Sequence, residues 1–433
     1  MMAIIVYYRR NNDSVSSGCT MTNLAILEPL RQRAEYTHKH NVKTGRHGWL
    51  RLTPAYSVRV VEELMDHTFG HLRVFDPFCG TATTALSAAY HGHAAVTTDI
   101  NPFLVWLGKA KTDYYSAAVI SRAREACKRA LDCVACDEEA QPSPPPIHNI
   151  QRWWSPAALS FLCRLQKAID LETEASSQEA TLLKVAFCRI LIASSNAAFN
   201  HQSMSFKEAP HSQLDVNVSY AALFGVDVNF VLQGASENPE GEAHIFLHDA
   251  RSLATLGNGP HDLVVTSPPY ANRMSYIREL RPYMYWLRFL MNGREAGELD
   301  WLAIGGTWGV ATSRLTDWHA DANTYTSGEL EQTLAKIGSP SNANGQLLAT
   351  YIRKYCVDMA LHFEGLRALL APGAELHYIV GNSTFYGELL SVEKIYAHMM
   401  RNLGFKDVSI RPIRKRNSKK ELIEFDVSAR WMG

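Results

Sequence analysis

Four consecutive residues, Ser267-Pro268-Pro269-Tyr270, directly follow a hydrophobic run, residues 262–266, that reads as a β-strand. The two prolines predict a rigid, extended exit from that strand, because proline lacks a backbone donor and restricts the residue before it. Such an exit would present a hydroxyl group, backbone carbonyls and an aromatic ring at the carboxyl end of a sheet, where the sites of α/β proteins form. Oxygen acceptors suit an exocyclic amino group, and a tyrosine ring can stack on a base. The pattern predicts chemistry on an aminated nucleobase; a loop with a chance pair of prolines is the alternative.

Two features upstream fit the binding of a nucleoside. The run Asp76–Thr81 (DPFCGT) lies between an expected strand, residues 72–75, and an expected helix, residues 83–91. Gly80 would let a ligand approach the backbone closely, and the helix start offers free N–H groups. Asp99 ends the next expected strand, 19 residues beyond Gly80, where a carboxylate can accept from both ribose hydroxyls. An ordinary tight turn and a helix N-cap are the alternatives. NAD is the rival ligand, but the chain lacks the G-x-G-x-x-G pattern here.

Strand and helix patterns alternate in the order that builds a doubly wound α/β sheet. Expected strands cover residues 72–75, 94–98, 243–247, 262–266 and 375–380, and a closing hairpin covers 408–413 and 422–429. Expected helices cover residues 54–67, 83–91, 101–140, 354–370 and 392–403, and residues 153–199 look mostly helical. Residues 200–240 and 293–345 look rich in loops. The prediction is an α/β fold with a mostly parallel sheet, an antiparallel C-terminal hairpin and a mainly helical insert.

The chain between the two chemical motifs is longer than such a sheet needs. Asp76 and Ser267 lie 191 residues apart, whereas three strand–helix crossovers take only about 90 residues at roughly 30 each. A functional insert is the economical explanation for the rest. We therefore expect an N-terminal arm (1–46), catalytic parts at 47–110, 241–292 and 351–433, a mainly helical insert at 111–240 and a loop-rich insert at 293–350.

Composition narrows the classes of protein. Lys+Arg and Asp+Glu both number 43, so any contact with nucleic acid must come from local patches. No run approaches the roughly 20 apolar residues of a membrane span, and the apolar start Met1–Tyr8 is short for a signal peptide, so we expect a cytoplasmic protein. Residues 1–20 look unrelated to the rest, and Met21 is a candidate start. Of eight cysteines only Cys133 and Cys136 form a C-x-x-C pair, which favours reduced thiols over a zinc site and predicts no metal.

Together these motifs resemble those of the amino-methylating DNA methyltransferases, and Ser-Pro-Pro-Tyr resembles the cytosine-N4 group of bacterial modification enzymes. The similarity runs from about residue 47 to the C-terminus and includes the upstream run Thr53–Tyr56 and the stretches 273–287, 304–309 and 414–425. It implies a Rossmann-like methyltransferase fold with S-adenosylmethionine as the cofactor. The implied cofactor site is Tyr56, Asp76, Pro77, Phe78, Cys79, Gly80, Thr81, Asp99, Ile100, Asn101, Asp249 and Ala250. The implied catalytic residues are Ser267, Pro268, Pro269 and Tyr270.

The resemblance also implies a mechanism of direct transfer to a flipped base. Acceptors at Ser267 and the following backbone would localise the lone pair of the amino group as its nitrogen attacks the methyl group, which requires mainly positioning and charge stabilisation. A cytosine-C5 enzyme would need a cysteine after a proline, and the chain has none. Two departures stand out. Ala82 replaces the second glycine of the cofactor motif, and the cofactor motif precedes the catalytic one, whereas many cytosine-N4 enzymes have the opposite order.

Basic residues indicate where double-stranded DNA would bind. The run Arg411–Lys420 has six basic residues in ten and is expected at a hairpin tip, where a solvated turn is the alternative. The predicted DNA contacts are Arg273, Arg278, Arg281, Arg414, Lys415, Arg416 and Lys419. Target recognition is expected to divide between the two inserts, and the paired Trp153 and Trp154 are expected in the core. A restriction endonuclease acting on the same site is the expected partner.

Three alternative functions stay open from the sequence. An adenine-N6 DNA methyltransferase would differ mainly at the position of Ser267. An RNA methyltransferase usually has Asn or Asp there and an RNA-binding module upstream. A cofactor-binding module that recognises DNA without modifying it belongs to another class, and a transfer assay would distinguish it.

Overall fold

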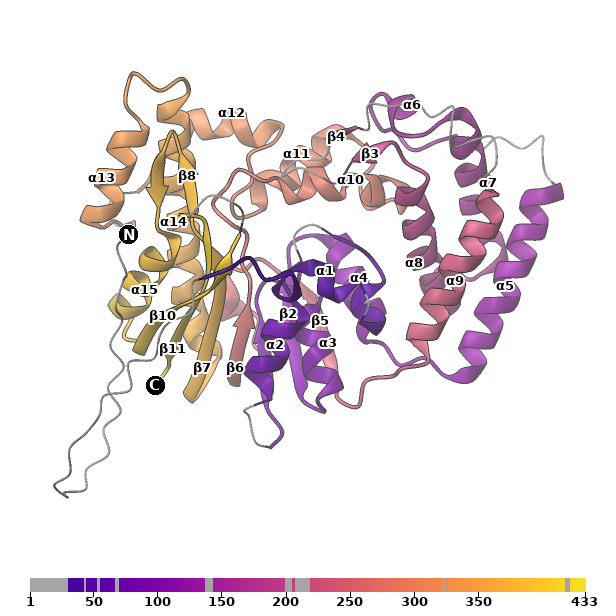
Figure 1. Ribbon diagram of the computed structural model, residues 1–433, viewed down its shortest axis with the longest axis horizontal. Coiled ribbons are helices and arrows are strands. Elements are labelled where there is room, and N and C mark those ends of the chain that lie inside the picture. The colour runs from indigo at the N-terminus through magenta and orange to yellow at the C-terminus, as the bar shows by residue number, and fades with distance from the viewer. Residues whose placement is uncertain are drawn as a thin grey trace.

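The computed structural model describes residues 30–42, 44–52, 55–66, 70–136, 143–198, 205–206, 219–321, 324–416 and 421–433. A seven-stranded sheet with the order β10-β11-β7-β6-β1-β2-β5 forms its centre (Figure 1). The strands are β1 (Arg73–Asp76), β2 (Ala94–Asp99), β5 (Ala243–Leu247), β6 (His261–Thr266), β7 (Leu370–Gly381), β10 (Lys406–Lys415) and β11 (Ile423–Arg430). Strands β5, β2, β1, β6 and β7 run parallel, and β11 pairs antiparallel with both β7 and β10. The predicted Rossmann-like α/β fold with its antiparallel hairpin is confirmed.

Helices cover both faces of this sheet. Val74 and Val265 pack with α2 (Val58–Met65) and α3 (Thr83–Tyr90) on one face. Phe75 and Val264, their neighbours in the same strands, belong to the core formed with α14 (Gly345–Leu366) and α15 (Val392–Asn402). Because successive side chains of a strand point to opposite faces, strands buried on both faces read as continuous hydrophobic runs.

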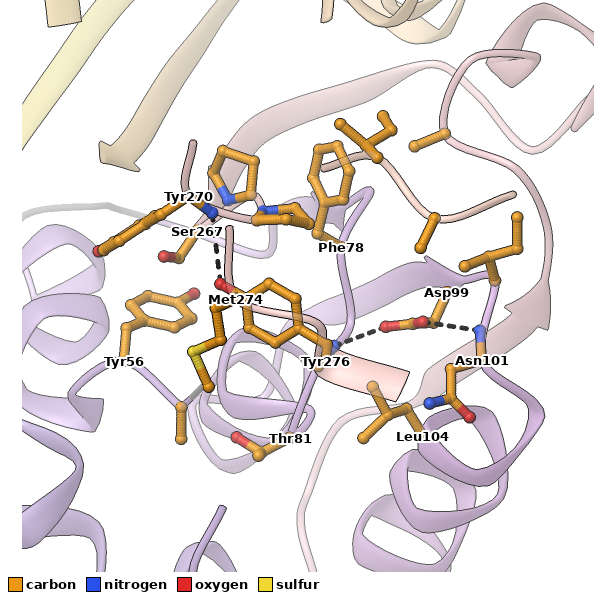
Figure 2. Close-up of a pocket in the computed structure, with 18 of the residues that line it drawn as sticks. Tyr56, Phe78, Thr81, Asp99, Asn101, Leu104, Ser267, Tyr270, Met274 and Tyr276 are labelled. Carbon is orange, nitrogen blue, oxygen red and sulfur yellow. Dashed lines mark hydrogen bonds between the residues drawn. The ribbon is translucent and has the colours of Figure 1, made fainter. Parts of the chain in front are cut away.

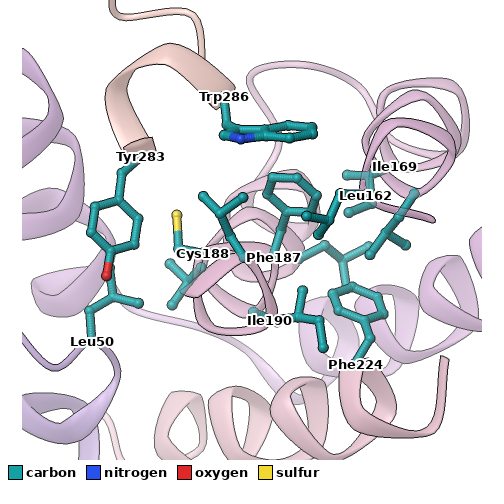
Figure 3. Packing of buried hydrophobic residues seen from close by; sticks show 14 of the residues in the cluster. Leu50, Leu162, Ile169, Phe187, Cys188, Ile190, Phe224, Tyr283 and Trp286 are labelled. Carbon is teal, nitrogen blue, oxygen red and sulfur yellow. The ribbon is translucent and has the colours of Figure 1, made fainter. Parts of the chain in front are cut away.

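A helical unit stands beside the sheet, on the right of Figure 1. It consists of α5 (Ala117–Cys136), α6 (Ile150–Trp153), α7 (Pro156–Glu172), α8 (Gln178–Ala193) and α9 (Tyr220–Ala235). Its core also takes in side chains from α4 (Pro102–Thr112) and α10 (Tyr276–Trp286), and Figure 3 shows Trp286 of α10 above Phe187 of α8. Their ring centroids lie 5.6 Å apart. Trp153 and Trp154 are 2% and 0% exposed, so both belong to the core, as expected.

Arg46 joins the helical unit to the sheet. Its guanidinium is buried and donates to Gly234 O and Ala235 O at the end of α9, at 2.9 Å each. It also donates to the last residues of α4 and the turn after it, at Lys111 O (3.0 Å) and Asp113 O (2.5 Å), and to Asn238 Oδ1 (2.7 Å). A guanidinium has five N–H donors in a fixed fork, so these five acceptors satisfy it fully.

Three predictions of local structure are wrong. The expected helix over residues 101–140 is two helices, α4 and α5, because the chain turns at 113–116, where Arg46 binds the free carbonyls. Residues 220–235, expected in a loop, form α9, which Ser219 caps by accepting from Ala222 N. The segment 293–345 contains α11 (Gly293–Leu302), α12 (Val310–Asp317) and α13 (Gly328–Ile337), and Asn292 and Ser327 cap two of them.

The remaining elements are short. They are α1 (His38–Asn41), β3 (Ala197–Ala198), β4 (Ser205–Phe206), β8 (Ser383–Phe385) and β9 (Glu388–Leu390). Figure 1 shows α10, α11 and α12 running along the upper side of the molecule, between α13 and the helical unit. No described helix is long and apolar enough to span a bilayer. Residues 1–29, which include Met21, lie outside the described ranges.

Candidate active site

One cavity opens where β1 and β6 end side by side in the middle of the sheet. This is the switch point of a doubly wound sheet, since the strands that follow in order lie on opposite sides of it. Figure 2 shows side chains from the turn after β1, from the end of β2 and from the segment after β6 around this cavity. Sixteen predicted site residues line it: Tyr56, Pro77, Phe78, Gly80, Thr81, Asp99, Ile100, Asn101, Asp249, Ala250, Ser267, Pro268, Pro269, Tyr270, Arg414 and Arg416.

The turn after β1 has the conformation that a close ligand needs. Gly80 has φ +50°, and a Cβ built there would meet only Phe78 O, at 3.7 Å, so the backbone faces open space. Ala82 also adopts a left-handed conformation, with φ 58° and ψ 32°. Alanine thus retains the backbone that a glycine would adopt more easily, at a cost of about 1 kcal/mol. The departure from the family pattern therefore leaves the turn in place.

Asp76 holds this turn through hydrogen bonds and does not line the cavity. Its Oδ1 accepts from Phe78 N at 3.0 Å and from the hydroxyl of Thr266 at 2.5 Å. Thr266 is the last residue of β6, so this bond ties the two strand ends together. Burial raises the pKa of Asp76 to about 7. Cys79, 2% exposed, likewise lies in the core.

Asp99 presents a carboxylate to the cavity. Its Oδ2 accepts from Gly80 N and its Oδ1 from Asn101 N, both at 2.9 Å. Each oxygen therefore keeps a further lone pair, which suits two neighbouring hydroxyl groups. Burial raises the pKa of Asp99 to about 6. The N-cap of α4 is Asn101, whose side chain accepts from Phe103 N, so the capping role falls to Asn101 and leaves Asp99 free to bind.

The segment after β6 forms the other end of the cavity. The hydroxyl of Ser267 donates to Ile379 O of β7 at 3.0 Å, so its oxygen lone pairs are left as acceptors. Pro269 O already accepts from the hydroxyl of Tyr355 at 2.8 Å. No described residue donates to the carbonyl of Pro268, and Pro268 lines the cavity.

Hydrogen bonds at both ends hold the ring of Tyr270. Its backbone N–H donates to the hydroxyl of Tyr276 at 3.3 Å, and its own hydroxyl donates to Glu424 Oε1 at 2.8 Å. Figure 2 shows Tyr270 beside Ser267, with Tyr276 and Tyr56 nearby. The hydroxyl of Tyr56 in turn bonds Thr84 of α3. Of the upstream run, Thr53 and Pro54 lie outside the described residues.

Asp249 lines the cavity beyond the end of β5, but its carboxylate is paired. Arg251 donates to both of its oxygens, at 3.0 and 2.7 Å. Burial alone would raise the pKa of Asp249, and the bonds from Arg251 lower it below its usual value. Arg251 also donates to Leu302 O at 2.8 Å and to Asp358 Oδ1 at 3.3 Å. This pairing fixes the wall around Ala250 and α11.

The predicted DNA contacts outside the cavity lie in different surroundings. Arg273 is exposed and Arg278, in α10, is half-buried; both follow residues 267–270 closely in sequence, and neither lines the cavity. Arg281 packs between the rings of Trp153 (5.1 Å) and Trp308 (5.4 Å), and burial lowers its pKa to about 10. Lys415 ends β10 outside the cavity. Lys419 lies outside the described residues.

The predicted site did not include the remaining residues of the cavity, although several lie in stretches whose similarity was noted. Glu424 follows the basic run, and several others belong to the stretch after Tyr270, whose similarity to modification enzymes was the available signal. The missed residues are Thr37, Ala55, Leu104, His248, Asn272, Met274, Tyr276, Ile277, Leu302, Ala303, Ile304 and Glu424. In the described part of the chain, no three His, Cys, Asp or Glu side chains gather closely enough to hold a metal ion.

Comparison with known proteins shows a distant similarity in sequence. No family model matches the chain. Type II methyltransferase M.BsoBI of Geobacillus stearothermophilus is 20% identical over 437 residues, which cover 88% of this chain and 82% of that protein. Among solved structures, rRNA methyltransferase aviRa from Streptomyces viridochromogenes matches with a TM-score of 0.28 and 11% identity over 87% of this chain and 86% of that one. Distant similarity to a Type II methyltransferase over most of both chains indicates that this protein is a methyltransferase.

Proposed function

We propose that the protein methylates the exocyclic amino group of a flipped base in double-stranded DNA, with S-adenosylmethionine as the methyl donor and cytosine N4 as the target. The observation that carries this proposal is that the Gly80 turn and Asp99 line the same cavity as Ser267, Pro268 and Tyr270. Similarity to a Type II methyltransferase supports DNA as the substrate. A restriction endonuclease that acts on the same site is the partner we propose.

The residues at one end of the cavity fit the cofactor. Asp99 has free acceptor positions for the two ribose hydroxyls, and the open backbone at Gly80 admits close approach. Phe78 and Ala250 supply apolar contact for an adenine ring, and Tyr56 lies toward the base end. S-adenosylmethionine bound there would supply an electrophilic methyl group. Exclusion of water by these walls would strengthen the electrostatic interactions at the other end.

The residues at the base end act on the amino group. Because the proton of the Ser267 hydroxyl is donated to Ile379 O, the Ser267 oxygen can accept one amino hydrogen. The carbonyl of Pro268 can accept the other. Two such acceptors draw the nitrogen lone pair out of conjugation with the ring. They stabilise the transition state more than the bound substrate, because positive charge develops on the nitrogen as it attacks. Tyr270 stacks on the base and offsets the cost of flipping, a few kcal/mol.

Binding of the duplex would use the side of the molecule onto which the cavity opens. Arg273 and Arg278 follow the catalytic segment directly, so their charges would meet the phosphates next to the flipped base. Lys415 would extend this contact along the hairpin. Recognition of the target sequence would divide between the insert at 111–240 and the insert at 293–350, which flank the cavity segment.

Cofactor affinity should depend on pH through Asp99. Its pKa is raised to about 6, and only the ionised carboxylate accepts both hydroxyls. Affinity should therefore be full above pH 7 and fall about tenfold as the pH drops to 5. Isothermal titration with S-adenosylmethionine measures it. Asp99→Asn should bind more weakly at every pH and lack the step near pH 6; a step of the same size in this variant would assign the titration elsewhere.

Transfer of a labelled methyl group tests the choice of nucleic acid. Purified protein is incubated with S-adenosylmethionine labelled on its methyl group and with unmethylated genomic DNA or total RNA. We expect label in DNA alone. Label in RNA alone would replace DNA with RNA as the substrate. Retention of DNA without any label would instead indicate a binding module that does not modify DNA.

A further inference from the structure

We propose that Arg416, Glu424 and Arg414 form a support that holds the ring of Tyr270 for stacking on the target base, and that Arg414 and Arg416 do not contact DNA phosphates. This Tyr270 support rests on the proposed function. It departs from the expectation that Arg414 and Arg416 contact DNA. Both arginines line the cavity and come from the C-terminal hairpin.

Arg416 is built into the protein beside Tyr270. Its guanidinium carbon lies 4.8 Å from the centroid of the Tyr270 ring, within the range of a cation–π interaction. Its Nη1 donates to Asn382 O at 2.7 Å, and its backbone N–H donates to Leu422 O at 2.9 Å. Arg416 thus lies over one face of the ring, and a base would stack on the opposite face.

A glycine makes room for this guanidinium. A Cβ built on Gly381, at the end of β7, would lie 2.6 Å from Arg416 Nη1, 2.9 Å from Cζ and 3.0 Å from Cδ. Contacts below 3.0 Å do not persist between such atoms, so any larger residue at 381 would push the guanidinium away. The position of Arg416 therefore depends on its packing against the sheet as well as on its charge.

Glu424 holds the other end of the ring. It is 4% exposed, and its carboxylate accepts from the hydroxyl of Tyr270 at 2.8 Å. Arg414 completes the pairing by donating to both oxygens of Glu424, at 2.8 and 3.1 Å, and its side chain is only 14% exposed. An arginine that is bound through its fork to a buried carboxylate has few donors left for a phosphate.

These contacts act on the step at which the base is held. Stacking is strongest when the ring is already fixed in the bound orientation, because less freedom is lost on binding. A loose Tyr270 would misplace the amino group relative to Ser267. Loss of the support should therefore lower the rate of transfer within the bound complex and leave affinity for DNA little changed.

Arg416→Ala and Gly381→Ala together test this account against phosphate contact. Gly381→Ala retains every charge but displaces the guanidinium. We expect both variants to slow single-turnover transfer at saturating DNA by about tenfold or more. We expect the salt dependence of DNA affinity to match the wild type. Lys406→Ala, which removes one exposed charge at the far end of β10, is the control and should leave the rate unchanged.

Phosphate contact predicts a different pattern. Arg416→Ala would then lower the slope of log affinity against log salt by about one, while Gly381→Ala would behave like the wild type. That result would overturn the Tyr270 support. Arg416→Ala should also cost less than twofold in rate when Tyr270 is already alanine, because its effect passes through that ring; an undiminished effect would overturn the proposal as well.

A measurement without DNA separates this inference from the proposed function. Thermal unfolding of Arg416→Ala, Tyr270→Ala and the double variant gives the coupling between the two side chains. We expect the two losses of stability to be non-additive even if the wild type transfers no methyl group to DNA. Additive losses would overturn the support whatever the substrate proves to be.

Discussion

Ser267→Ala should lower kcat for methyl transfer by about 10²-fold or more, while cofactor affinity stays within about twofold of the wild type. The hydroxyl of Ser267 donates to Ile379 O and offers its lone pairs to the amino group. Alanine leaves the base with Pro268 O as the remaining acceptor at this end, so stabilisation that develops as the nitrogen attacks is lost. Steady-state transfer and cofactor titration on the same preparation measure the two quantities.

A second serine variant tests whether the loss of any serine hydroxyl would lower kcat. Ser428→Ala also removes one serine hydroxyl and one hydrogen bond, that to Ser409 Oγ at 2.9 Å, but on the hairpin away from the cavity. It should leave kcat unchanged. A kcat for Ser267→Ala within threefold of the wild type would remove Ser267 from the catalytic group, since a lost acceptor in a closed site costs far more than that.

Arg46→Met should lower the stability of the protein by about 3 kcal/mol, because several buried acceptors lose their donor. The substitution keeps an unbranched side chain of similar length but removes the donor from five oxygens, three of them in buried hydrogen bonds. Those oxygens end α4 and α9, so the junction between the helical unit and the sheet should loosen first. Urea unfolding followed by tryptophan fluorescence measures the loss, because Trp49, 5.6 Å from the guanidinium, lies at this junction.

Arg122→Met, in α5 of the helical unit, provides the comparison. Arg122 is 59% exposed on its side chain and makes one ion pair, with Glu179 at 2.6 Å. Surface pairs contribute roughly 0–1 kcal/mol, so this variant should unfold near the wild type. Equal losses for Arg46→Met and Arg122→Met would mean that Arg46 does not join the two parts of the protein.

The position of the site could be read from the sequence because strand ends determine it. Asp76, Asp99 and Ser267 each follow a hydrophobic run, and parallel strands bring their carboxyl ends to one edge. The partners of these residues could not be read in the same way. Ile379 and Tyr355 contact the catalytic segment through pairing of β6 with β7 and packing of α14, and neither has a motif of its own.

The helices at 293–345 were missed for a local reason. Their sequence is rich in Gly, Ser, Thr and Asn, which reads as loop, but several of these residues cap short helices. Asn292 and Ser327 accept from backbone N–H groups at helix starts, and Gly309 precedes α12 with φ 61°. The composition of this segment therefore reflects its many helix ends, and the short helices between those ends could not be recognised from it.

Helix α9, expected in a loop-rich region, contains two glycines. Gly234 lies near its end, and a Cβ there would lie 2.5 Å from Trp49 Nε1. The residue is thus a site of close packing between the helical unit and residues far away in sequence. Partners distant in sequence could not be predicted for the basic run either. The sequence shows the number of charges in that run, but not that Arg414 binds Glu424 and Arg416 lies over the ring of Tyr270.

Nucleoside analysis of DNA tests the central claim most directly. The chain and its Ser267→Ala variant are expressed separately in a host that lacks DNA methylation, and the digested DNA is examined by mass spectrometry. The account predicts N4-methylcytosine with the wild type and a much lower level with Ser267→Ala. N6-methyladenine in its place would contradict the choice of base while keeping the site. Absence of any methylated base, from a folded protein that binds S-adenosylmethionine, would contradict the claim that DNA is the substrate.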